Sequence, residues 1–170
     1  MSGVTDGNAL VALQIRSALL SALDLSTPID TLSILKQVAF GNGTGSVQLS
    51  QHWHDTRTLG PSATENLDLA GALVNGFGAT VTFTKVKILY IAAAAGNTND
   101  VQVSRGASNG FVLFLATSDA IVLHPGDFTL YCAATGAGTT VTAGTGDILT
   151  VTNGAAGTSV TYDIFIGGND

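Results

Sequence analysis

The chain has 170 residues, of which 45% are hydrophobic and only 11% are charged, and its net charge is −6. This length is enough for one domain with a sizeable core. A typical soluble domain is roughly 25% charged, so the surface here is left largely to Thr, Ser, Ala and Gly. Such a surface suits a subunit whose faces are buried in an assembly. The acidic balance and the scattered positions of the 6 Lys and Arg residues argue against nucleic acid as a partner.

Cysteine usage and the N-terminal residues bear on the cellular compartment. Cys132 is the only cysteine, so no intramolecular disulfide can form and nothing indicates an oxidising compartment. The N-terminus has no basic region ahead of an apolar stretch, which argues against a secretory signal. Arg16 and Asp24 interrupt the best candidate for a membrane helix. We therefore expect a protein made and assembled in a cytoplasm, with no membrane partner.

The first apolar segment, residues 10–25, fits two patterns. Helical spacing gathers its leucines on one stripe, whereas strand spacing alternates residues such as Leu13 and Ile15 with Gln14 and Arg16. We favour the extended conformation. A turn at residues 26–30 and a strand at residues 31–40 follow. The sequence thus predicts an extended N-terminal arm at residues 1–30 and a β-sandwich domain at residues 31–170.

Residues 80–95 are the longest run of strand-forming residues. The apolar positions change parity at Thr84 and Lys85. Because strand side chains repeat every two residues, one inserted residue flips every later side chain to the other face. We therefore predict a bulge or a change of partner strand at this point. From Val86 onward both faces are apolar, which indicates a strand covered on both sides.

The rest of the chain has the pattern of short strands separated by turn residues. Pro125 and Gly126 suit the two middle positions of a type II turn. Residues 66–78 are expected to form a short helical turn or an irregular crossover. Strands at roughly 8 to 12 residue spacing indicate an all-β sandwich or barrel. The predicted short strands are 46–59, 101–103, 111–116, 120–123, 127–133, 139–143, 147–152 and 159–166.

Two histidines are the sharpest candidates for site chemistry. Residues at i and i+2 of a strand project to the same side, so His52 and His54 would supply two metal ligands, with Asp55 or His124 as a third. A His-x-His pair without a further ligand defined by the sequence is a weak signal. Positions on a strand surface or at a subunit contact explain the same residues. We therefore assign no metal site, no cofactor and no catalytic residue.

No other motif indicates an enzyme. The carboxylates mostly lie in or beside turns, where Asp is expected for turn chemistry. The chain has no Gly-x-Ser-x-Gly elbow, and the glycine-rich residues 41–46 lack the lysine and the following helix of a phosphate loop. A chain with many β-branched residues, little charge and no convergent polar group is typical of proteins built for packing and assembly.

Six stretches carry a family resemblance: WHDTRTL (53–59), LDLAG (67–71), FGATVTFTKVK (77–87), PGD (125–127), VTAGTGDIL (141–149) and VTYDIFIG (160–167). They resemble a family of small virion proteins of tailed bacteriophages, some of which are capsid decoration, or cement, proteins. The resemblance spans about residues 31–167. It implies a jelly-roll-like antiparallel β-sandwich that forms a homotrimer, binds the major capsid protein on the outer capsid surface and bridges capsomers. Such a protein is made in the host cytoplasm and is not an enzyme.

Two alternatives use other residues. A tail or head fibre component that binds a host surface glycan would use Trp53, Tyr90 and Tyr131 as a sugar platform, although core or interface positions explain each of them. A metal-dependent, cupin-like enzyme on the same architecture would depend on His52, His54 and His124. In the decoration protein, residues 4–25 are expected to reach a neighbouring subunit, since an apolar strand with a free end can add to the edge of another sheet.

Overall fold

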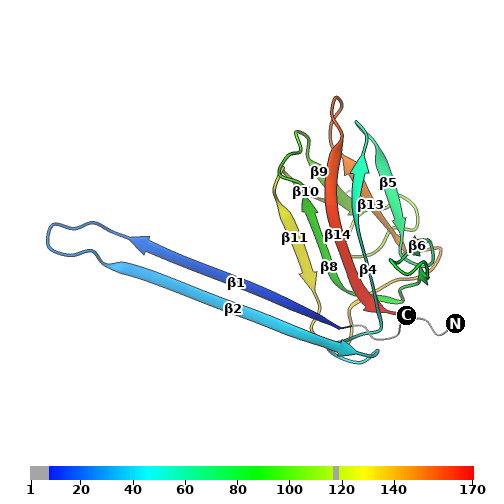
Figure 1. The fold of residues 1–170 in the computed structure, drawn as a ribbon, viewed down its shortest axis with the longest axis horizontal. Coiled ribbons are helices and arrows are strands. Elements are labelled where there is room, and N and C mark those ends of the chain that lie inside the picture. Colours follow the sequence, from blue (N-terminus) through cyan, green and yellow to red (C-terminus); the bar gives the residue numbers. More distant parts are fainter. Residues whose placement is uncertain (1–7, 117–118) are drawn as a thin grey trace.

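The computed structural model describes residues 8–116 and 119–170, and these residues form strands, turns and loops without a helix. Figure 1 shows two parts, a sandwich of two sheets and a long hairpin that projects from the base of the sandwich. The expectation of an all-β, antiparallel sandwich is therefore confirmed. None of the described residues form a helix with the length and hydropathy needed to cross a membrane.

Each layer of the sandwich has four main strands, and neighbouring strands run antiparallel. The first sheet has the order β11-β8-β14-β4, and the second has the order β10-β9-β13-β5. The first consists of β4 (Gln51–Leu59), β8 (Lys85–Ala93), β11 (Phe128–Cys132) and β14 (Val160–Asn169), with the short β12 (Thr139–Thr140) paired to β8. The second consists of β5 (Thr64–Asp68), β9 (Val101–Arg105), β10 (Ala120–Leu123) and β13 (Ile148–Asn153).

The main core lies between these two sheets. On β14 the apolar residues predicted to share one face are buried, among them Tyr162 and Ile164, and they pack with Leu149 and Val151 of β13. The other face of β14 and β8 is the outer face of the first sheet. Near its start β8 is buried on both faces, because Ile88 packs in a second, smaller cluster outside the sandwich. The prediction of a strand covered on both sides is confirmed for that part of β8.

The parity change predicted at Thr84 and Lys85 is a change of partner strand. β7 (Thr80–Val81) pairs with β6 (Leu73–Val74), whereas β8 begins at Lys85 and pairs with β14. The β8–β14 register also shifts, because Gly167 lies opposite Ile88 and Gly168 lies opposite Val86. The intervening residue, Lys87, is fully buried, and its ammonium donates to the carbonyl oxygens of Gly45 at 2.6 Å and Gln48 at 2.7 Å. Burial lowers the pKa of this lysine.

Gly168 allows the close approach of β14 and β8 at this shift. A Cβ atom at this position would overlap the carbonyl oxygen of Lys85. We expect Gly168→Ala to lower the free energy of unfolding by about 2 kcal/mol, because the two strands must separate to admit the methyl group. Gly60→Ala is the matched control, since no heavy atom lies within 4 Å of its added Cβ. Equal effects of the two substitutions in chemical denaturation would contradict this explanation.

Two loop predictions have different outcomes. The type II turn is confirmed, because Gly126 has a φ of 89° and the Asp127 N–H donates to the His124 carbonyl at 2.8 Å. The strand predicted at residues 111–116 is wrong. This segment forms turns and bends, and the Arg105 guanidinium donates to the carbonyls of Gly110 and Leu115. Phe111, Leu113 and Phe114 pack on the core without joining a sheet, whereas Val112 and Leu115 are exposed.

The prediction for residues 66–78 is also only partly right. This segment contains no helical turn, since β5 ends at Asp68 and the short strand β6 follows after a turn. The Asp68 carboxylate accepts a hydrogen bond from the Ala70 N–H at 2.8 Å, and this local contact forms the turn that leads out of the sheet. The segment is therefore an irregular crossover between the sheets.

The projecting hairpin consists of β1 (Ala9–Leu20) and β2 (Ile29–Asn42), and we call residues 9–42 the arm. The strands pair antiparallel without a break from Ala9–Phe40 to Leu20–Ile29. The short β3 (Gln48–Leu49) lies parallel to the base of β2. The extended conformation favoured for residues 10–25 is confirmed for β1. The boundary predicted after residue 30 falls inside this hairpin, because residues 31–40 pair with β1 and not with the sandwich.

Candidate functional site

The two faces of the arm differ in composition. Directly opposed residues of an antiparallel pair lie on the same face, so the register assigns each side chain. One face carries 7 of the 11 Val, Leu and Ile side chains in the paired segments, and we call it the apolar face. The other face includes Gln14, Arg16, Ser33 and Gln37 among its apolar residues. The apolar face consists of the pairs Ala9–Phe40, Val11–Val38, Leu13–Lys36, Ile15–Ile34, Ser17–Leu32 and Leu19–Asp30.

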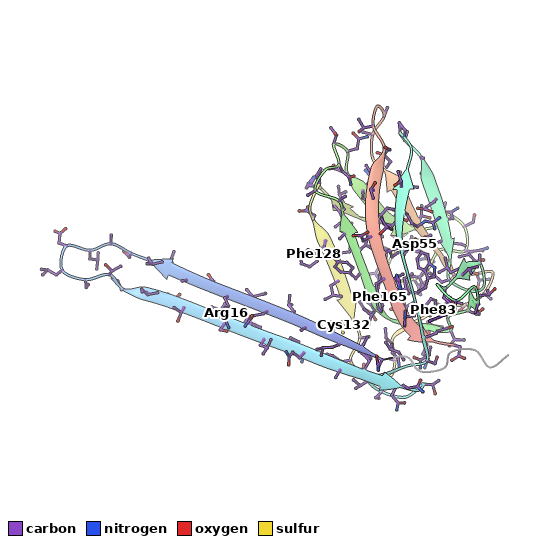
Figure 2. All side chains as sticks on the ribbon, viewed as in Figure 1. Arg16, Asp55, Phe83, Phe128, Cys132 and Phe165 are labelled. Carbon is purple, nitrogen blue, oxygen red and sulfur yellow. The ribbon has the colours of Figure 1, made fainter. Side chains whose placement is uncertain are left out.

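The base of the apolar face packs on the outer face of the first sheet. Phe40 is 3% exposed and forms a buried cluster with Leu49 and Ile88. Val11 and Val38 of the arm are half-buried against the same cluster, together with Leu130, Cys132 and Phe165 of the sheet. Figure 2 shows Cys132 close to the base of the arm. Apolar contact therefore holds the base of the arm against its own sandwich.

Beyond this base the arm has no covering layer. On the apolar face Ile15 is 46% exposed, Ile34 is 44% exposed and Leu32 is 53% exposed. Among the described residues, 11 of the 17 large exposed hydrophobic side chains lie between Leu10 and Leu35. A two-stranded hairpin is at best marginally stable alone in water, and soluble monomers rarely expose so large an apolar surface. The distal arm, an uncovered apolar surface, is therefore the candidate site.

A second, partly exposed apolar surface lies on the outer face of the first sheet, next to the base of the arm. The register aligns Tyr90, Leu130 and Phe165 in one row across the strands, with Phe128 and Ala92 in the next row. We call these five residues the outer patch. Phe128 is 59% exposed, and its ring lies 6.1 Å from that of Tyr90. A shallow hollow of about 530 Å³ adjoins the patch, and its lining includes His54, Tyr90, Asp163 and Phe165.

His52 and His54 project from β4 on this same outer face. Their ring centroids are 5.9 Å apart, and the ring of His52 stacks 5.6 Å from that of Phe165. The two candidates for a third ligand have other partners. The Asp55 carboxylate forms an ion pair with Arg57 at 3.0 Å, and the Nδ1 of His124 lies 2.8 Å from a carboxylate oxygen of Asp100. Within the described part of the chain, no three His, Cys, Asp or Glu side chains are grouped to hold a metal ion. The histidine pair therefore lies exposed on the outer face, beside Phe165.

The position of His52 leads to a pH prediction. Burial, with a smaller effect from the nearby His54, lowers the pKa of His52, so the unfolded chain binds a proton more readily than the folded chain. The stability that the neutral His52 side chain contributes is fully present above about pH 6.5, and it is lost as the pH falls below that value. We expect the free energy of unfolding to fall less between pH 7.5 and 5.5 in His52→Gln than in the unsubstituted chain.

His124 offers a control of opposite sign. Its hydrogen bond to Asp100 raises the pKa of His124, so this contribution is present at low pH and is lost as the pH rises through the raised value. His124→Gln should therefore make the fall in stability between pH 7.5 and 5.5 steeper. Parallel pH profiles for the two variants would exclude the assigned role of His52.

The three aromatic residues considered for glycan binding do not lie together. Trp53 is 3% exposed in the main core, and its indole N–H donates to the carbonyl of Val74 at 3.2 Å. Tyr131 packs against the same core, and its hydroxyl accepts a hydrogen bond from Thr139 at 3.0 Å. Only Tyr90 belongs to the outer face. A single exposed platform therefore does not form from these residues.

Sequence reasoning missed the outer patch and the second half of the arm. Phe165 was the residue that broke the polar side of an alternating strand, and that break was the available signal for an apolar outer face. For the arm, the signal was the turn around Pro28 between two apolar segments of similar length. The comparisons with protein-family descriptions, with curated proteins and with solved structures yielded no match.

Proposed function

We propose that this protein is a structural component of a tailed-bacteriophage virion, a capsid decoration protein without enzymatic activity. It self-associates on the outer capsid surface, binds the major capsid protein and bridges neighbouring capsomers. The observation that carries this proposal is the arm, a long hairpin whose distal Leu and Ile side chains are uncovered on both faces. Such a surface is buried only when a partner covers it, and a low content of charged residues fits that arrangement.

The strand order supports a jelly-roll topology. The eight sandwich strands follow the chain order β4, β5, β8, β9, β10, β11, β13 and β14. Numbered from one to eight in that order, the sheets read 1-8-3-6 and 2-7-4-5. This order matches the one expected of a jelly roll built from two Greek keys, an architecture that viral capsid domains share with lectins and cupins. Fold alone does not specify function, so the proposal depends on the arm and on the family resemblance.

The resemblance to cement proteins implies, in addition, a trimer that binds at threefold or quasi-threefold positions of the head. This role is physically reasonable because many copies of the protein would bind the same head. Each copy contributes a modest number of contacts, but linked copies bind with an avidity far above that of one contact. The arm would supply the link between copies, and another surface of the sandwich would then meet the shell.

The test combines the mass of the purified protein with binding to heads. We expect light scattering to give a trimer and co-sedimentation to show saturable binding to heads that lack the protein. Heads that already carry a full complement are the control, and they should take up no more. A monomer at micromolar concentration, or an oligomer that fails to sediment with bare heads, would contradict the proposal.

A further inference from the structure

We infer that the distal apolar face of the arm docks on the outer patch of a second copy of the chain, so that neighbouring copies exchange arms. The inference depends on the self-association in the proposed function and names the two surfaces that meet. The docking segment comprises Leu13, Ile15, Leu19, Leu32 and Ile34. The receiving surface is the outer patch formed by Tyr90, Ala92, Phe128, Leu130 and Phe165.

The contact at the base of the arm shows the chemistry of this docking. There the same face of the same hairpin, through Val11, Val38 and Phe40, already packs on the same sheet near Ile88 and Cys132. From this contact the two surfaces diverge. The apolar face of the arm continues away from the sandwich through Ile15 and Ile34, and the outer face of the sheet continues along β8 and β11 through Tyr90 and Phe128. Each continuation extends an interface that the molecule already forms. The arm side chains and Phe128 are exposed, whereas Leu130 and Phe165 are half-buried at the edge of the cluster under the base of the arm.

The arm cannot cover its own outer patch. Its strands remain paired in register from base to tip, and Figure 1 shows the hairpin pointing away from the sandwich. The part beyond Val11 spans about 30 Å at 3.4 Å per residue, so the distal residues lie far from the patch of the same chain. Folding back would require breaking the ladder near Leu13. A second copy supplies the same patch without that cost.

A second copy is favoured over other partners by number and by geometry. Every copy presents one arm and one outer patch, so exchange covers both surfaces in equal numbers. The contact is head-to-tail, because a different surface is used on each side, and such contacts close into rings when the rotation between copies permits. A ring of exchanged arms is compatible with the proposed trimer, whereas arm-to-arm pairing would leave every outer patch uncovered.

Photo-crosslinking in the assembled protein tests the inference. A benzoylphenylalanine replaces Leu32 on the apolar face, and the probe-bearing chain is mixed with ¹⁵N-labelled chains before irradiation. We expect crosslinks to labelled peptides from β8, β11 or β14. The same probe at Val122, which is 44% exposed on the other sheet, is the control and should give few. Crosslinks from Leu32 to another arm or to the second sheet, or an oligomer without crosslinks between copies, would overturn the inference.

A charge placed in the patch gives an independent measurement. Phe128→Glu should weaken association between copies at least tenfold, whereas Val122→Glu should change it less than threefold. Both side chains are exposed, so both variants are expected to fold. Equal weakening by the two variants would overturn the assigned patch. Head binding measured on the same preparations separates the two proposals. If the crosslinks fall on the wrong surface but head binding is intact, only arm exchange is rejected. If the crosslinks fall on the outer patch but the oligomer does not bind heads, only the decoration role is rejected.

Discussion

Replacing Ile15, Leu32 and Ile34 by threonine is expected to lower the association constant between copies at least about 100-fold, with the sandwich still folded. All three lie on the distal apolar face and are about half exposed in a single chain. Burying a Leu or Ile side chain contributes about 1.5–3 kcal/mol, and a hundredfold change needs only about 2.8 kcal/mol. Threonine retains a high strand propensity, so the hairpin can still form. Sedimentation velocity over a concentration series measures the change.

The opposite face of the arm supplies the matched control. Leu10, Leu20 and Ile29 are 57% to 67% exposed and lie on that face. Their replacement by threonine removes a similar apolar area from the same hairpin. We expect less than a tenfold change in association, because the apolar face is the one that continues the buried contact at the base of the arm. Equal losses for the two triple variants would mean that association does not depend on one face.

The second large effect concerns Glu65, whose carboxylate joins three strands of the sandwich. One oxygen accepts a hydrogen bond from the buried Tyr162 hydroxyl at 2.6 Å. The other accepts from the Arg57 guanidinium, with the Nε at 2.7 Å and the Nη2 at 2.6 Å. Burial and the Glu65 carboxylate raise the pKa of Tyr162 above its ordinary range, and the hydrogen bond to Glu65 raises the pKa of Arg57. The Tyr162 hydroxyl and the Arg57 guanidinium thus both use the half-buried Glu65 carboxylate as a hydrogen-bond acceptor.

We expect Glu65→Ala to lower the free energy of unfolding by about 3 kcal/mol. The substitution leaves the buried Tyr162 hydroxyl without its acceptor and removes the oxygen that the Nε and Nη2 of Arg57 share. Unpaired buried polar groups are costly. Asp55→Ala is the control on the same arginine. Its carboxylate is 45% exposed and lies 3.0 Å from Arg57, so its loss should cost less than about 1 kcal/mol. Urea denaturation compares them, and a similar loss for both would show that burial of Glu65 is unimportant.

The features that could be predicted from the sequence depend on local geometry. Alternation along residues 160–166 predicted a strand with Tyr162 and Ile164 inward, since strand side chains repeat every two residues wherever the strand lies. The turn at Pro125 and Gly126 followed from the φ preferences of those two residues. The parity change at Lys85 predicted a bulge or a new partner strand, because strand side chains repeat every two residues. None of these conclusions required knowledge of distant residues.

The candidate site depended on contacts between distant segments. Residues 31–40 have an alternation that either a sandwich or a hairpin would satisfy, and only the pairing with β1 assigns them to the arm. His52 and His54 share a face by local geometry, but Phe165 comes beside them from another strand far along the chain. The sequence by itself determined most of the strands, the turn at Pro125 and the class of fold. Tertiary structure decided which apolar faces are covered, because coverage depends on the partner that each strand meets in space.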